Sequence, residues 1–204
     1  MNRRVRSMVR SSPLEFADVV DLVAARRRSR ELIAIDGLPL SGKSTLATMI
    51  HDRLGITTVG CDDFFLPRHS WPSDIQPAFP FSFFRMDEVY DFLDRVAASG
   101  RGSYHPYDWE LRTISASAIS VDISSGPLII EGCSVLAPEL APRFALSFFV
   151  ESDAASVLSA RRARDGTGDE EDWEKLFLPS VEMYMRTDPA SRATHVVAGR
   201  GWSH

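Results

Sequence analysis

Residues 37–44, Gly-Leu-Pro-Leu-Ser-Gly-Lys-Ser, have the types and spacing that suit phosphate binding. Their pattern, Gly-x-x-x-x-Gly-Lys-Ser, matches the Walker A motif in full. The glycines let the backbone turn several N–H groups toward phosphate oxygens, and a following helix adds the positive end of its dipole. A purely structural glycine-rich turn is the alternative. We expect a nucleotide-phosphate site made of Gly37, Ser41, Gly42, Lys43, Ser44 and Thr45, in which Lys43 reaches the β- and γ-phosphates and the Ser44 hydroxyl holds Mg²⁺.

Three carboxylates follow apolar segments that could be strands. Asp62 and Asp63 come after residues 56–60, and Glu131 ends the run Leu-Ile-Ile-Glu. Beside a phosphate loop, a carboxylate at a neighbouring strand end could accept a proton from an attacking hydroxyl or help to coordinate Mg²⁺. We therefore predict a metal site made of Ser44 and Glu131. An exposed acidic turn and a solvent-facing strand end are the alternatives.

Two further groups of residues could serve the same reaction. Arg161 and Arg164 are three residues apart, so on a helix they share a face and could clamp a transferring phosphoryl group. Cations favoured at the end of a helix are the alternative. Residues 104–112 could line an acceptor pocket or form a packed turn. The predicted substrate contacts are Asp63, Phe64, Tyr107, Asp108 and Arg112, with Trp109 as a further candidate for the pocket lining.

The elements that must position these residues follow an α/β pattern. Short apolar runs at 31–36, 56–60, 127–132, 145–152 and 193–199 are typical of strands that are buried on both faces. Helical spacing of apolar residues marks 44–54, 89–99 and 173–184, with a helix expected from 153 to 164 and a kink at Pro179. An N-terminal helix is expected to begin with a capping box at Ser12–Glu15 and Pro13 in its first turn. A parallel sheet of this kind binds ligands at the carboxyl ends of its strands.

Residues 61–85 read as one long loop because four prolines and six phenylalanines occur there without a period. Loops of this length are often functional. The organisation that we predict is a single domain over 1–204, with an N-terminal arm and helix at 1–30, an acceptor-side loop at 61–85 and a lid at 161–172.

Composition excludes several classes of protein. The chain has 204 residues, and 44% of them are hydrophobic, which is ordinary for a globular protein. Its net charge of −5 argues against a general nucleic-acid-binding surface. No apolar run approaches the length of about 18–20 residues that spans a bilayer. We expect a cytoplasmic protein with no nucleic-acid or membrane partner; a transit peptide in the arginine-rich residues 1–12 and a homodimer stay open.

Four segments carry a resemblance to the uridine kinase, nicotinamide riboside kinase, phosphoribulokinase and bacterial pantothenate kinase branch of the P-loop kinases. Gly-Leu-Pro-Leu-Ser-Gly-Lys-Ser-Thr is its phosphate loop. Asp-Asp-Phe-Phe at 62–65 resembles its Asp-x-Phe-Tyr/Phe element. Pro-Tyr-Asp-Trp at 106–109 is similar to the Tyr-Asp-Phe segment of uridine kinases, and Arg-Arg-Ala-Arg-Asp at 161–165 to the lid signature.

The resemblance implies a three-layer α/β/α P-loop NTPase fold with a mostly parallel sheet of about five strands. It also implies a kinase that transfers the γ-phosphoryl group of ATP, with Mg²⁺, to a hydroxyl of a small metabolite of nucleoside or riboside type. Asp62 would be the general base, Lys43, Arg161 and Arg164 would stabilise the developing charge, and Tyr107 and Asp108 would lie near the acceptor. The His-Pro-Asp stretch of uridine kinases is absent, since residues 80–87 are aromatic and keep only Asp87. An NTPase that uses water as acceptor and a nucleotide-binding module without catalysis are the alternatives.

Overall fold

A five-stranded sheet organises the protein in the computed structural model, which describes residues 12–153, 156–157, 159, 161 and 170–201. All of its strand pairs are parallel, and the strand order is β2-β7-β1-β8-β9. The strands are β1 (Leu32–Gly37), β2 (Thr57–Gly60), β7 (Leu128–Glu131), β8 (Leu146–Glu151) and β9 (His195–Ala198). The five apolar runs of the sequence therefore form the predicted parallel sheet.

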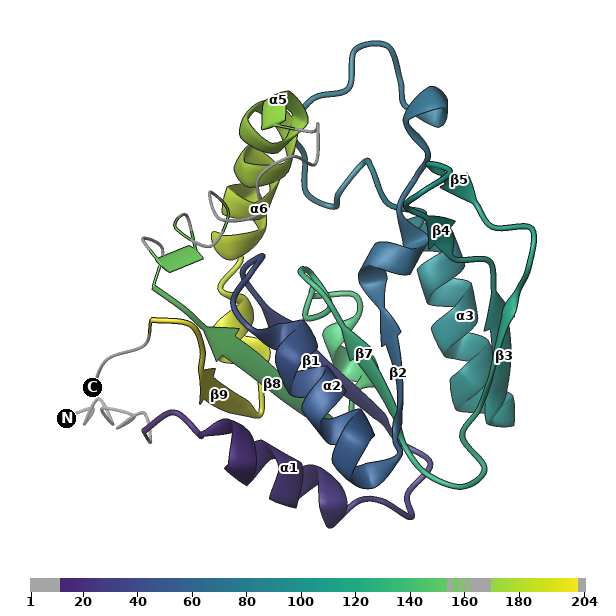
Figure 1. The fold of residues 1–204 in the computed structure, drawn as a ribbon, viewed down its shortest axis with the longest axis vertical. Coiled ribbons are helices and arrows are strands. Elements are labelled where there is room, and N and C mark those ends of the chain that lie inside the picture. Colours follow the sequence, from purple (N-terminus) through teal and green to yellow (C-terminus); the bar gives the residue numbers. More distant parts are fainter. Residues whose placement is uncertain (1–11, 154–155, 158, 160, 162–169, 202–204) are drawn as a thin grey trace, which may run out of the picture.

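Helices cover both faces of this sheet (Figure 1). The helices α1 (Phe16–Ala24) and α2 (Lys43–Leu54) pack on the face that carries Ile33 and Ile35. The helix α3 (Met86–Ser99) packs on the opposite face, which carries Leu32 and Ala34. Successive residues of a strand point to opposite faces, so a continuous apolar strand supplies both cores. The predicted three-layer fold is confirmed.

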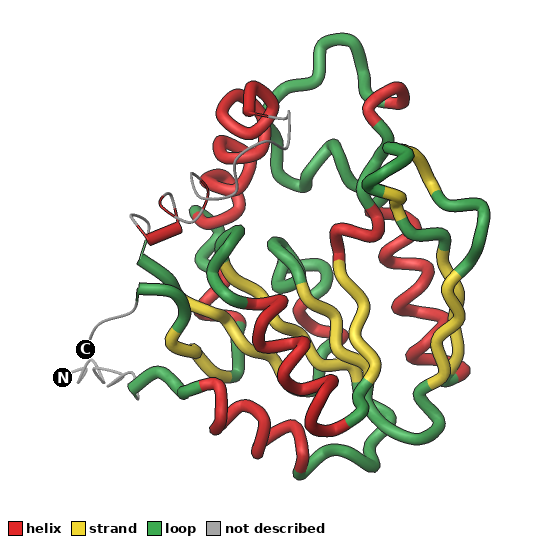
Figure 2. The backbone as a smooth tube through the Cα atoms, viewed as in Figure 1, coloured by secondary structure: helices red, strands yellow, loops and turns green. Residues whose placement is uncertain are grey.

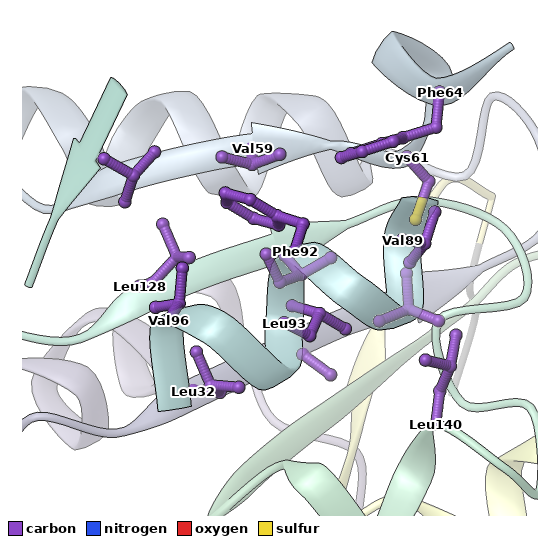
Figure 3. Packing of buried hydrophobic residues seen from close by; sticks show 14 of the residues in the cluster. Leu32, Val59, Cys61, Phe64, Val89, Phe92, Leu93, Val96, Leu128 and Leu140 are labelled. Carbon is purple, nitrogen blue, oxygen red and sulfur yellow. The ribbon is translucent and has the colours of Figure 1, made fainter. Parts of the chain in front are cut away.

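The core beneath α3 links the sheet to the acceptor-side loop. Figure 3 shows Val89, Phe92 and Leu93 of α3 packed toward Val59 of β2 and toward Phe64. The helix ends at Ser99 because Gly100 follows in the left-handed conformation, with φ of 75°. The loop 61–85 begins with a short 3-10 helix, Cys61–Phe64, which is anchored in this core. A second 3-10 helix, Arg68–Ser70, follows within the loop.

The start of the N-terminal helix differs from the prediction. Leu14 is not helical: its N–H donates to Val196 O (2.9 Å), and its carbonyl accepts from Ala198 N (2.9 Å). The capping box is formed by Glu15 and Asp18 in place of Ser12 and Glu15. The residues before the helix thus cover the outer edge of β9. An edge strand needs such cover, because its unpaired N–H and C=O groups could otherwise pair with another chain.

Residues 101–122 also differ from the prediction, because the structure has two antiparallel ribbons there. The strands β3 (Arg101–Tyr104) and β6 (Ile119–Asp122) form one ribbon, and β4 (Tyr107–Asp108) and β5 (Thr113–Ile114) form the other. These strands are short and half exposed. They therefore lack the alternation of apolar and polar residues from which a strand is predicted.

The last helical region begins with α5 (Glu170–Asp172), continues as a π-helical turn (Trp173–Phe177) and ends as α6 (Leu178–Met185). Pro179, where a kink is predicted, lies in the first turn of α6, directly after the π-helical turn. Of the expected helix 153–164, the described residues 156, 157, 159 and 161 are helical and residue 153 is not, and the rest, like most of the expected lid 161–172, lies outside the described residues. Two further 3-10 helices are Ala141–Arg143 and Pro189–Arg192.

Figure 2 shows the 61–85 loop rising over the carboxyl edge of the sheet, with the last helical region on the other side of that edge. Among the described helices, none is long and apolar enough to cross a membrane.

Candidate active site

The phosphate loop joins β1 to α2, as its motif requires. A Cβ atom on Gly37 (φ 152°) would stand 2.4 Å from Val150 O, and one on Gly42 (φ 112°) would stand 3.3 Å from the Phe16 ring. Only glycine accepts this backbone at such close range. The residues form a narrow turn of backbone directly before the N-terminus of a helix, which suits an anion.

Two polar side chains of the loop are buried in a way that suits a bound anion. Ser41 is fully buried, and its Oγ has no hydrogen-bond partner among the described residues. Lys43 is buried as well, and its Nζ donates to Leu38 O (2.8 Å), a carbonyl of its own loop. A buried hydroxyl without a partner among the described residues and an ammonium that donates to a neutral carbonyl both suit the addition of phosphate oxygens.

Ser44 and Glu131 meet at the carboxyl edge of the sheet. The Ser44 Oγ donates to Glu131 Oε1 (3.0 Å). Glu131 ends β7, where it is in register with Ile35 of β1 and Gly60 of β2. Burial raises the pKa of Glu131, while the charge of Lys43 and the hydrogen bond from Ser44 oppose the rise. The structure therefore brings together the two residues that the sequence pairs in a metal site.

The two adjacent aspartates behave differently. Asp62 lines the cavity described below, together with Lys43 and Glu131. Asp63 accepts a hydrogen bond from Tyr104 Oη (2.7 Å) and is not among the cavity-lining residues, and burial raises its pKa above the ordinary value. Because Asp63 is not among the lining residues, its predicted contact with a substrate stays a prediction.

The predicted substrate contact of Phe64 needs a correction. Phe64 is 2% exposed and lies in the core, where its ring stacks on Tyr104 with centroids 4.9 Å apart. Phe65 is the residue that lines the cavity. Both phenylalanines follow the aspartates, so only the packing against α3 decides which ring turns inward.

One cavity of about 550 Å³ connects these groups. Its lining includes Gly42, Lys43, Ser44 and Thr45, together with Asp62 and Glu131. Half of the remaining wall is aromatic, and its aromatic residues come from three regions of the chain. Its aromatic members are Phe65, Phe81, Phe83, Phe84, Trp109, Trp173 and Phe177.

The 104–112 segment contributes less to the cavity than expected. Trp109 lines it, whereas Tyr107 is buried behind, with its ring 4.8 Å from Trp109 and 5.3 Å from Phe65 by centroids. Asp108 Oδ1 accepts the N–H groups of residues 110 and 111, each at 2.9 Å, and so closes a turn. Arg112 is exposed in that turn, with φ of 53°. The cavity lining therefore does not include Tyr107, Asp108 or Arg112, which lie in the segment that carries Trp109.

The predicted clamp is described only in part. Arg161 lines the cavity, and its guanidinium lies over Trp173, 5.0 Å from the ring centroid. Arg164 lies outside the described residues, so the expected pairing of the two arginines stays a prediction.

Two residues at this site were missed from the sequence. Arg200 lines the cavity, and its Nε donates to Leu40 O of the phosphate loop (3.1 Å). Asp36 is fully buried behind the loop and accepts from Gly37 N, Leu136 N and Tyr184 Oη at 2.5–2.6 Å. Burial raises its pKa, against the effect of these hydrogen bonds and of Lys43. The signal for Asp36 was a charged residue inside an otherwise apolar strand.

Comparison with solved structures identifies the fold. A possible uridine kinase from Bacillus stearothermophilus matches with a TM-score of 0.68 at 21% identity, over 89% of this chain and 98% of that one. A candidate fructose transport system kinase from Silicibacter sp. TM1040 matches with a TM-score of 0.65 at 22% identity, over 93% and 100%. A candidate P-loop kinase from Saccharomyces cerevisiae, which carries a circular permutation, matches with a TM-score of 0.59 at 12% identity, over 93% and 98%.

No family model matches the sequence, and no curated protein matches it. The likeness therefore lies in the three-dimensional arrangement of the chain around its parallel five-stranded sheet. The protein has the fold of the P-loop kinases.

Proposed function

We propose that the protein is a small-molecule kinase, which transfers the γ-phosphoryl group of ATP to a hydroxyl of a nucleoside-like or riboside-like metabolite. One observation carries this proposal. Lys43, Ser44, Glu131 and Asp62 line one cavity together with seven aromatic residues. A phosphate site joined to a sheltered pocket suits a kinase, because it keeps water away from the reactive phosphate.

The donor end suits the phosphates of ATP. The N–H groups of the loop and Lys43 would bind the β- and γ-phosphates, and Arg161 would approach from the opposite wall. Ser44 and Glu131 offer the hard oxygen ligands that Mg²⁺ prefers. The described residues contain no group of three or more metal-binding His, Cys, Asp or Glu side chains, which agrees with an ion held by few protein ligands and by substrate phosphates. When bound, Mg²⁺ would neutralise charge on the phosphates.

The transfer step follows from the position of Asp62. The acceptor oxygen forms a bond to the γ-phosphorus while the bond from that phosphorus to the β–γ bridging oxygen breaks. The Asp62 carboxylate takes the proton of the acceptor hydroxyl and later releases it to solvent. The products are a phosphate ester and ADP. Positioning and charge stabilisation by Lys43 and Arg161 supply most of the rate enhancement in reactions of this kind.

The aromatic wall supports the class of acceptor. Phe65, Phe83 and Trp109 offer ring faces and edges to the cavity, and flat rings pack favourably against such surfaces. The carboxylate of Asp62 lines the same cavity, where it can accept a hydrogen bond from a hydroxyl group of the acceptor. A nucleoside or riboside, with a flat base and free hydroxyl groups, fits this description.

The experiment is an ADP-release assay with Mg²⁺–ATP and a panel of uridine, cytidine, nicotinamide riboside, ribose, D-fructose and D-glycerate. We expect slow ATP turnover alone and acceleration of at least tenfold by one of the nucleosides or ribosides. Equal turnover with every compound would favour a hydrolase that uses water. Nucleotide binding without any turnover would favour a module without catalysis.

The variant Asp62→Asn tests the role of the base. We expect kcat for the best acceptor to fall by about 10²–10⁴-fold, the usual contribution of general base catalysis. The dissociation constant for ATP, measured by calorimetry, should stay within a few-fold, because Asp62 does not belong to the phosphate loop. Near-normal kcat in this variant would remove Asp62 from the mechanism.

A further inference from the structure

Arg85 is a buried arginine that the transfer step does not use. It is the last residue of the 61–85 loop and immediately precedes α3, and it is 8% exposed. It is not among the residues that line the 550 Å³ cavity. Burying a guanidinium is costly unless hydrogen bonds and an opposite charge compensate it, so its contacts call for an explanation.

Those contacts are mainly backbone carbonyls of the segment that carries Asp62. The backbone N–H of Arg85 donates to Phe64 O (2.8 Å), its Nη2 to Asp63 O (2.8 Å) and its Nε to Phe65 O (3.3 Å). Three consecutive carbonyls that follow Asp62 are therefore all held by one residue.

The same guanidinium also contacts the 104–109 segment. Its Nη2 also donates to His105 O (2.8 Å), between β3 and β4, and its Nη1 pairs with Glu88 of α3. The plane of the group lies over the Phe64 ring, 5.7 Å from the centroid. In Figure 1 the first turn of α3 lies close to β4, which is where these segments meet.

Only arginine can make this set of bonds. A guanidinium presents five N–H donors in a rigid planar fork, whereas a lysine ammonium has three donors at a single point. Lysine at this position would keep the charge but could not reach the carbonyls of 63, 65 and 105 together.

We propose that Arg85 is a positioning residue, which through these carbonyls orients Asp62 toward the acceptor hydroxyl and holds the 61–65 segment in register with the 104–109 segment. This inference rests on the proposed function for its kinetic part. The mechanical part, the coupling of the two segments, is independent of any substrate.

The kinetic test is a double-mutant cycle with Arg85→Lys and Asp62→Asn, with uridine as acceptor and with water as a second acceptor. A misplacement of about 1 Å can cost about 10²-fold in rate, so we expect Arg85→Lys to lower kcat by that order while KM for ATP stays within about twofold. In the Asp62→Asn background the same change should alter kcat less than about twofold, because residues that act as a unit are not additive. A purely structural role would give multiplicative losses instead.

The mechanical test is hydrogen exchange of the amides, measured by mass spectrometry. We expect faster exchange in peptides covering 61–66 and 104–110 of Arg85→Lys, and unchanged exchange in a peptide covering 37–46. This readout needs no acceptor. Should Arg85→Lys fail to fold, Arg85→Met serves in its place with the same expected pattern. Unchanged exchange in both segments would overturn the inference even if catalysis were confirmed.

Two variants are matched controls. Glu88→Gln removes the charge partner but leaves the carbonyl bonds of Arg85, and Arg143→Lys alters an arginine that pairs with Asp94 elsewhere on α3. Both should keep kcat within about twofold. If Asp62→Asn itself retains wild-type transfer, the proposed role of the base has failed; if Asp62→Asn is inactive and Arg85→Lys is normal, only the positioning role has failed.

A chemical rescue adds a further readout. A second cavity of about 440 Å³ lies beside Arg85, with Phe84 and Glu88 also in its lining. In the variant Arg85→Ala, ethylguanidinium should enter this cavity and raise kcat at least tenfold. The same compound should not change kcat of Arg143→Ala. Absence of any restoration in a folded Arg85→Ala protein would contradict the proposed fork of contacts.

Discussion

At the scale of single residues, Glu131 illustrates how a proposed metal ligand can conflict with stability. Its carboxyl is buried at the end of β7, and burial raises its pKa above the ordinary value of 4.5. The neighbouring charge of Asp62 raises it further, and Lys43 and Ser44 lower it. The folded protein thus holds the Glu131 proton more tightly than the unfolded chain does.

The variant Glu131→Gln should therefore be more stable than the wild type at neutral pH, while its Mg²⁺-dependent turnover falls by about 10²-fold or more. The folded-state pKa is raised, so the contribution of Glu131 to stability falls as pH rises above about 4.5, and the advantage of the variant should disappear as pH is lowered to that value. Urea unfolding at several pH values without nucleotide measures this. A variant less stable than the wild type at pH 7 would contradict the argument.

At the scale of elements, the acceptor-side loop and the last helical region face each other across the cavity. Arg68 of the loop binds Asp172 of α5 through two bonds, Nη1 to Oδ2 (2.7 Å) and Nη2 to Oδ1 (3.1 Å). Behind this pair the Phe177 ring packs against Phe83, with centroids 4.8 Å apart. The Arg68 side chain is 60% exposed, so solvent screens the pair and its net stabilisation is below about 1 kcal/mol.

Asp172→Asn should change the free energy of unfolding by less than about 1 kcal/mol but raise KM for the acceptor several-fold, because the two elements are then less firmly joined over the pocket. The swap Arg68→Asp with Asp172→Arg should recover part of the affinity. Arg101→Ala, which breaks an exposed pair with Asp122 on the β3–β6 ribbon, is the matched control and should leave KM unchanged. Steady-state kinetics at low and at high salt would separate these outcomes, since salt screens the exposed pair.

At the scale of the whole molecule, Asp36 joins parts of the chain that are far apart in sequence. It ends the central strand β1, and its Oδ2 accepts from Leu136 N (2.6 Å) and from Tyr184 Oη (2.5 Å) of α6. Burial also raises the pKa of Tyr184, so its hydroxyl stays a donor at neutral pH. One carboxyl thereby anchors the segment after β7 and the last helix to the base of the phosphate loop.

Asp36→Ala should lower the free energy of unfolding by roughly 2–5 kcal/mol, because it leaves buried donors without an acceptor. Tyr184→Phe removes a single donor and should cost roughly 1–3 kcal/mol. Denaturant unfolding followed by far-UV circular dichroism measures both. Equal stability of Asp36→Ala and the wild type would show that the contacts at Asp36 contribute nothing net.

The amino-acid sequence by itself determined the local and periodic features of the protein. The phosphate loop is contiguous, so its strand, turn and helix are all specified within residues 32–54. The parallel sheet followed from apolar runs that are buried on both faces. The meeting of Ser44 and Glu131 also followed, because the carboxyl ends of parallel strands share one edge of the sheet.

Only the tertiary structure decided which neighbours of those residues turn toward the cavity. Asp62 and Asp63 are adjacent and identical in type, and so are Phe64 and Phe65; the packing of the 61–64 turn against α3 separates their roles. The contacts of Arg85 with 63, 65 and 105, and of Asp36 with Tyr184, join residues 20 to 148 positions apart. Such pairings depend on the order β2-β7-β1-β8-β9, which is set by packing between remote segments and leaves no local pattern in the chain.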